Sequence, residues 1–235
     1  VSLISFWLTS AWRPSRPRAA EGMGEMVKFG AHLTGTSLIG TLARMSDKLI
    51  IGRGLGTEMV GIFSNASRLI LVPNKPLTSV AIPVLSRMQH EPERFRAFYS
   101  RGVEAIVMIL APICLVAFVS AEHVVLLFLG DQWVESIPVF QALAPAALIG
   151  STNVVTSWVY VPLGQTARQF KWQVFRSVCT IIAYLIGLQW GVVGVAVAYS
   201  ILSITLRVPA IIYCLHGTFL RLRDVVAALW RIVVA

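Results

Sequence analysis

The side chains best placed to do chemistry in this sequence are polar groups that stand inside apolar segments. They are Arg44, Asp47, Lys48, Arg68, Asn74, Lys75 and Glu104. An Arg, Lys or Asp at the centre of a membrane helix costs roughly 2.5–3.5 kcal/mol on insertion scales, so such residues face a bundle interior or water and mark function by default. The basic and amide members suit a wet, cationic cavity, whereas the carboxylates suit charge pairing or ion coupling.

The first three charges lie within one helical turn of each other. Because Arg44 precedes Asp47 by three positions and Lys48 by four, a helix places Arg44 beside both. One polar or small stripe at helical spacing contains His32, Thr36, Gly40, Arg44 and Asp47. We expect this face to line a bundle interior or water. The alternative is that Arg44 and Asp47 neutralise each other and only pin two helices together.

Two prolines predict a break in the next apolar segment. Pro73 and Pro76 each lack a backbone donor, and Pro76 disfavours the helical conformation at Lys75. Broken helices at membrane depth are tolerated where they are buried in protein or line a cavity, so Arg68, Asn74 and Lys75 are predicted to face one. The alternative is a packing kink from which Lys75 reaches the surface.

Two further charges lie near the inner ends of apolar segments. Glu104 pairs with Arg101 at the surface or titrates as a coupling carboxylate. Arg207 is expected to extend its guanidinium to the membrane surface.

The composition of the chain indicates which kind of structural element holds these residues. The 235 residues are 56% hydrophobic and only 13% charged, with a mean hydropathy of +0.74. A soluble domain has about 25% charged residues, so a disordered or soluble chain is disfavoured. The net charge of +9 would suggest nucleic acid in a soluble protein, but here the basic residues sit between apolar runs and reflect membrane topology.

The apolar runs predict an all-α, polytopic membrane helix bundle with six full transmembrane helices and a partial helix at each end. The expected spans are 26–52, 60–87, 95–119, 136–163, 168–189 and 192–215, with a short interfacial helix at 121–130. The predicted organisation is the end of a truncated helix at 1–12, a cytoplasmic linker at 13–25, a six-helix bundle at 26–215, and a loop and further helix start at 216–235.

The loops alternate sharply in positive charge. One set holds thirteen basic residues: Arg13, Arg16, Arg18, Lys28, Arg87, Arg94, Arg96, Arg101, Arg168, Lys171, Arg176, Arg221 and Arg223. The opposite loops hold Arg53 alone. The positive-inside rule therefore places the linker and every second loop in the cytoplasm.

Enzyme motifs are missing from the sequence. It contains no Walker A pattern, no HExxH and no GxSxG, and its three cysteines lack metal-ligand spacing. We therefore predict a protein that is not an enzyme and that has no cofactor and no metal site.

Several segments, in order along the chain, resemble one family of transporters. They are Trp12–Pro14, Asp47–Gly56, Val60–Ala66, Ile82–Gln89, Leu129–Trp133 and Gly191–Ala196. Together they are similar to the polysaccharide-transporter (Wzx-type) flippases of the multidrug/oligosaccharidyl-lipid/polysaccharide exporter superfamily.

The resemblance implies two six-helix bundles around a central cavity, of which this chain would hold the second. The missing N-terminal bundle would then be a partner from the same protein. The family moves polyprenyl-pyrophosphate-linked oligosaccharide, an O-antigen or exopolysaccharide repeat unit, to the outer leaflet of the bacterial inner membrane. That cargo, membrane lipids and an H⁺ or Na⁺ coupling ion are the implied partners, with no nucleic acid.

The resemblance also assigns provisional roles to the embedded polar residues. The expected substrate-binding residues are Arg44, Lys48, Arg68, Asn74 and Lys75, since arginine can bind phosphate bidentately. Asp47 and Glu104 are expected to serve charge pairing or coupling. The alternatives are a multidrug or small-metabolite antiporter, a membrane-embedded glycan polymerase, and a scaffold that does not transport.

Overall fold

The computed structural model describes residues 23–71, 75–150, 153–220 and 223, without the side chains of 68–71, 75–80, 110, 148 and 153–155. Within these ranges every regular element is a helix, as predicted. The elements are α2 (Met23–Leu55), α3 (Thr57–Leu71), α4 (Lys75–Arg87), α5 (Pro92–Val119), α6 (Ala121–Leu129), η2 (Asp131–Trp133), α7 (Ser136–Gly150), α8 (Asn153–Tyr160), α9 (Thr166–Gly187), η3 (Leu188–Trp190), α10 (Gly191–Thr205) and α11 (Arg207–Leu215).

Glycines in the left-handed conformation mark the tightest turns at one end of the bundle. Gly56 lies between α2 and α3 with φ 95°, and Gly191 begins α10 with φ 75°. Side chains with a Cβ rarely adopt this conformation, so glycine allows the chain to reverse there. Both turns fall where the sequence predicts loops.

One of the predicted spans is divided within the described residues: the segment 192–215 was expected to be continuous, but it contains α10 and α11. The segment 60–87 contains α3 and α4, and the segment 136–163 contains α7 and α8. The residues that join these two pairs, 72–74 and 151–152, lie outside the described part of the chain. The division at Leu206 has a local cause, because Pro209 has no N–H to donate to the carbonyl of Thr205.

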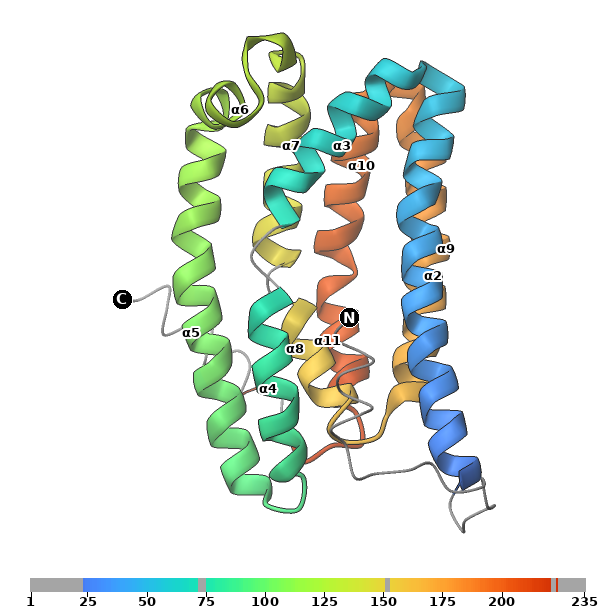
Figure 1. Cartoon of the computed structure of the whole chain (residues 1–235), viewed down its shortest axis with the longest axis vertical. Coiled ribbons are helices and arrows are strands. Elements are labelled where there is room, and N and C mark those ends of the chain that lie inside the picture. Colours follow the sequence, from blue (N-terminus) through green and yellow to red (C-terminus); the bar gives the residue numbers. More distant parts are fainter. Residues whose placement is uncertain (1–22, 72–74, 151–152, 221–222, 224–235) are drawn as a thin grey trace, which may run out of the picture.

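The helices form a bundle in which most axes run along the long dimension. Figure 1 shows α2 beside α9 at one edge, α5 at the opposite edge, and α7 and α10 between them. One buried cluster joins α4, α5, α8 and α11 around Tyr99 and Trp158. A second joins α2, α3, α6, α7, α9 and α10 around Phe140 and Tyr184.

In the part of the chain that the structure describes, two helical stretches are long and apolar enough to cross a membrane. They are Pro92–Val119, which is α5, and Thr166–Leu215, which contains α9, η3, α10 and α11. Ser136–Ala147 is a shorter apolar helix. An all-helical membrane bundle is therefore compatible with the described chain, and the count of six spans stays a prediction.

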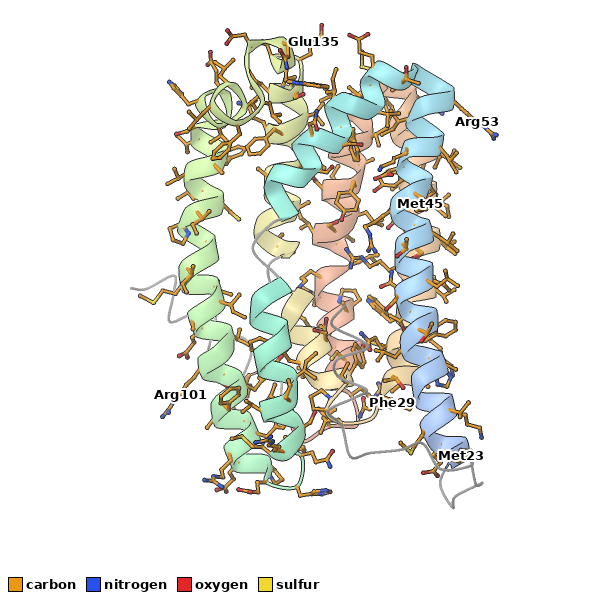
Figure 2. The ribbon with its side chains drawn as sticks, viewed as in Figure 1. Met23, Phe29, Met45, Arg53, Arg101 and Glu135 are labelled. Atoms are coloured by element: carbon orange, nitrogen blue, oxygen red, sulfur yellow. The ribbon has the colours of Figure 1, made fainter. Side chains whose placement is uncertain are left out.

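The connections rich in basic residues and those poor in them lie at opposite ends of the bundle. The α4–α5 and α8–α9 connections lie at one end of the bundle, and the α2–α3, α5–α6 and α9–α10 connections lie at the other (Figure 1). Figure 2 shows Arg101 near the first end and Arg53 at the opposite one. This matches the alternation in the sequence. The predicted segment 1–12, most of the linker, and the helix start near Asp224 lie outside the described residues.

Candidate functional site

The predicted charge cluster lies in the middle of α2. The Arg44 side chain is exposed and donates a hydrogen bond to Thr41 Oγ1 over 3.0 Å. Asp47 is half-buried, and its Oδ1 accepts the backbone N–H of Lys48. Among the described side chains, no carboxylate oxygen lies within 4.0 Å of Arg44 or Lys48. Both cations are therefore open to an external anion.

The outward face of α2 carries a polar stripe that differs from the one expected. We call it the α2 polar stripe, and it consists of Thr34, Ser37, Thr41, Arg44 and Lys48. Thr41 is half-buried and the other four are exposed. The predicted stripe with His32 and Gly40 packs against α9, and so faces the bundle interior as expected. The His32 ring lies 6.0 Å from that of Phe170, and Gly40 is buried against Gln173.

The remaining predicted residues are only partly visible. Asn74 lies outside the described residues, and the side chains of Arg68 and Lys75 also lie outside the described part. Glu104 is half-buried on α5, at the edge of the bundle opposite α2. The structure thus brings together Arg44, Asp47 and Lys48 and places Glu104 apart from them.

A cavity of about 220 Å³ opens where α7, α8 and the α10–α11 joint meet α9, and we call it the joint cavity. Its walls come from the end of α7, from α8 and α9, and from the α10–α11 joint. The lining residues with functional groups are Thr156, Ser157, Tyr160, Gln169, Trp172, Gln173, Arg176, Ser203 and Arg207. Irregular backbone at this depth is expected only around such a cavity or within protein.

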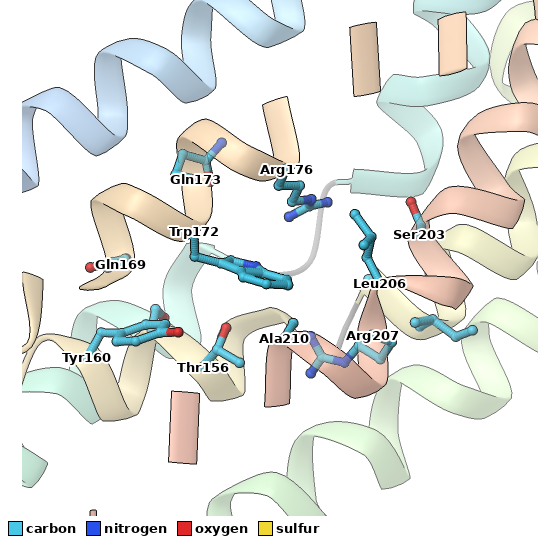
Figure 3. A pocket seen from close by; sticks show the side chains of 13 residues that line it. Thr156, Tyr160, Gln169, Trp172, Gln173, Arg176, Ser203, Leu206, Arg207 and Ala210 are labelled. Atoms are coloured by element: carbon cyan, nitrogen blue, oxygen red, sulfur yellow. The ribbon is translucent and has the colours of Figure 1, made fainter. Parts of the chain in front are cut away.

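Two arginines approach the joint cavity from different helices. Figure 3 shows Arg176 from α9 and Arg207 from α11 directed into the space beside the Trp172 ring. They lie close enough for their charges to repel each other. Of the described residues that line the cavity, none is acidic. The lining is therefore cationic.

Both arginines correct the sequence-based expectation. Arg207 is only 8% exposed, so it does not extend to the membrane surface. Arg176 was assigned to a cytoplasmic loop, but it lies three turns inside α9 and faces the cavity. The signal for Arg176 was present, since Gln169, Gln173 and Arg176 follow helical spacing on one face. For Arg207 no local pattern distinguished burial from surface exposure.

Aromatic rings continue the wall of the joint cavity toward the basic end of the bundle. The Trp172 ring stacks on Tyr213 at 5.5 Å, and the Arg168 guanidinium lies 4.9 Å from the centre of the Tyr213 ring. Arg168 also donates to the carbonyl oxygens of Tyr213 and His216. This arginine ties the end of α11 to α9, which holds the cavity wall in place.

A family model described as polysaccharide biosynthesis protein matches residues 1–138 of this chain. Lipopolysaccharide biosynthesis protein WzxC of Escherichia coli K12 is 26% identical over 207 residues, which are 86% of this chain and 42% of that protein. Amylovoran biosynthesis protein AmsL of Erwinia amylovora is 26% identical over 211 residues, 85% of this chain and 53% of that protein.

A third relative carries transport in its name. Succinoglycan biosynthesis transport protein ExoT of Rhizobium meliloti is 26% identical over 185 residues, 77% of this chain and 37% of that protein. The chain therefore spans about half the length, or less, of these curated relatives. No solved structure matches it.

Proposed function

This chain belongs to the polysaccharide biosynthesis protein family, and on that premise we propose that it is part of a flippase for lipid-linked oligosaccharide. The cargo is a polyprenyl-pyrophosphate-linked repeat unit of an O-antigen or exopolysaccharide. The flippase moves it to the outer leaflet of the bacterial inner membrane by alternating access. The chain supplies the second of two six-helix bundles, and the rest of the protein supplies the first. The names of WzxC and ExoT support this proposal.

The α2 polar stripe is the observation that carries the proposal. α2 runs beside α9, which belongs to an apolar stretch long enough to span a membrane. With α9 spanning the membrane, the stripe beside it is proposed to lie at membrane depth. Its cations cannot face acyl chains without a cost of roughly 2.5–3.5 kcal/mol each, so the stripe faces water or the opposing bundle.

The chemistry of the stripe suits a pyrophosphate group. Arg44 offers a planar fork that binds phosphate oxygens bidentately, and Lys48 adds a compact positive charge one turn away. Arg68, Asn74 and Lys75 complete the proposed phosphate site. Binding of this kind needs no covalent step and no ATP hydrolysis.

The carboxylates take part in coupling rather than in cargo binding. Asp47 holds the backbone at Lys48 through its hydrogen bond and is placed to exchange H⁺ or Na⁺ as the stripe is occupied and vacated. Glu104, on the far edge, is the second candidate for ion coupling. A multidrug antiporter for cationic compounds would need an acidic pathway, and the stripe is basic.

Export of surface polysaccharide tests the proposal. In the full-length protein, Arg44→Gln combined with Lys48→Gln should abolish export, while the variant inserts at the wild-type level. Arg53→Gln is the matched control, because Arg53 is an exposed cation at the outer end of the same helix. Normal export by the double variant would refute the role of the stripe.

A further inference from the structure

Three kinds of side chain line the joint cavity: two arginines, an aromatic ring and several neutral hydrogen-bonding groups. A phosphate site does not require all three. Phosphate alone needs only the cations. A sugar ring with a carboxylate needs all three, because its apolar face packs on an aromatic ring while its hydroxyl and carboxylate oxygens bond to polar groups.

The cations in the cavity are positioned for a carboxylate. Arg207 is more than nine-tenths buried, and Arg176 reaches the same space from another helix. Guanidinium forks match the two oxygens of a carboxylate, and charge-assisted bonds of this type are about twice as strong as neutral ones. With no acidic residue among the described lining, an entering anion meets no repulsion from the wall.

The neutral groups are placed to recognise hydroxyls. Gln169 and Gln173 lie one turn apart on the α9 wall on either side of Trp172. The Gln169 Oε1 atom is buried and has no hydrogen-bond partner in the described part of the chain. A buried amide oxygen without a partner is unfavourable, and a donating sugar hydroxyl would satisfy it.

The size of the cavity suits one residue of a glycan. Pockets for drug-sized ligands usually measure roughly 300–1,000 Å³. The joint cavity, at about 220 Å³, matches a smaller group such as a single sugar ring.

The cavity adjoins the α2 polar stripe. A Cβ atom built on Gly40 would lie 3.4 Å from Gln173 Nε2 and 3.5 Å from Arg44 Nη1. Gln173 is part of the cavity lining, whereas Arg44 belongs to the stripe. The two sites are therefore neighbours on either side of the α2–α9 contact.

We propose that the joint cavity is a subsite for an acidic sugar of the cargo, with Arg176 and Arg207 on its carboxylate and Trp172 beneath its ring. The inference rests on the proposed function, to which it adds a substrate class. It predicts a transporter that prefers repeat units containing a uronic acid or a similar carboxylated sugar near the pyrophosphate.

Binding to the purified full-length protein in nanodiscs tests the chemistry of the cavity. The probes are a methyl glucuronide, the matching methyl glucoside and inorganic phosphate. Calorimetry measures the binding affinity of each. The glucuronide should bind about tenfold or more tightly than the glucoside, since it adds charge-assisted bonds. Arg176→Gln should remove that preference, and Trp172→Leu should weaken both sugars while leaving phosphate unchanged.

The control in this experiment is Lys171→Gln, which removes an exposed cation from the same helix and should keep the preference. Equal binding of glucuronide and glucoside would overturn the proposal. The proposal would also be overturned if inorganic phosphate bound as tightly as the glucuronide and Trp172→Leu left glucuronide binding unchanged. The cavity would then be a phosphate site. Arg176 is chosen over the more buried Arg207 so that folding is preserved.

An export experiment separates this inference from the proposed function. Cells that make either an acidic or a neutral repeat unit carry the wild-type protein or Arg176→Gln. We expect the variant to lose about tenfold or more of acidic-glycan export and to keep neutral export. Equal loss of both would overturn the acidic-sugar subsite alone. If the wild-type protein exports neither glycan, the proposed function itself fails.

Discussion

The α9–α10 hairpin is held by two glycines whose backbones touch. A Cβ atom on Gly187 would lie 2.6 Å from the carbonyl oxygen of Gly194 and 2.7 Å from Val195 Cα. Ordinary contacts begin at 3.4 Å, so Gly187→Ala requires the two helices to separate by about 0.8 Å. The atoms in the way belong to the backbone and cannot rotate aside.

The expected cost follows from two opposing effects. Overpacking of a close contact costs about 1–3 kcal/mol. Alanine recovers at most about 1 kcal/mol through its greater helix propensity. The net loss of about 1–2 kcal/mol should lower the melting temperature by roughly 2–8 °C for a protein of this size.

The assay is thermal unfolding of the purified full-length protein in detergent, followed by the loss of the monodisperse size-exclusion peak. Gly30→Ala is the matched control, because Gly30 is a helical glycine with nothing within 4 Å of its added Cβ. That variant should be as stable as the wild type or slightly more so. If Gly187→Ala melts at the wild-type temperature, the close contact between α9 and α10 is wrong.

Two other contacts make separate predictions. Arg168→Gln should destabilise the protein by about 2 kcal/mol, because it removes charge-assisted bonds to the end of α11 from a half-buried site. Thermal unfolding measures this effect, and a loss no greater than that of Lys171→Gln would contradict it. Ser200 is buried on α10 and donates to the carbonyl oxygen of Ala142 on α7. Ser200→Ala should cost about 1 kcal/mol in the same assay, whereas Ser37→Ala on the exposed stripe should cost nothing; equal melting temperatures would refute this bond.

Helix positions could be predicted from the sequence because hydropathy and proline act locally. The prolines at 73 and 76 predict a helix division at residues that lie outside the described part of the chain, so this division stays a prediction. Pro209 is the same kind of signal for the α10–α11 joint, which the structure describes. That division was missed because a proline in the first turn of a helix is well tolerated and is easily taken for part of a continuous span.

The site was harder to predict because it depends on which helices are neighbours. Arg44 and Lys48 were identified from their charge alone, and the structure leaves both exposed. The predicted stripe with His32 and Gly40 does face the bundle interior, but the sequence does not show that α9 is the helix it packs on. Arg207 was missed for the same reason, because its neighbours include Tyr99 on α5 and Arg176 on α9.

The central claim is that cations on α2 carry a pyrophosphate-linked glycan across the membrane, and a direct measurement of flipping tests it. The full-length protein is reconstituted in liposomes with a fluorescent polyprenyl-pyrophosphate-linked glycan, and an impermeant quencher reports the leaflet in which the label lies. The account predicts that wild type and Arg53→Gln move the label between leaflets and that Arg44→Gln with Lys48→Gln does not. Equal flipping by the double variant, or none by the wild type, would contradict it.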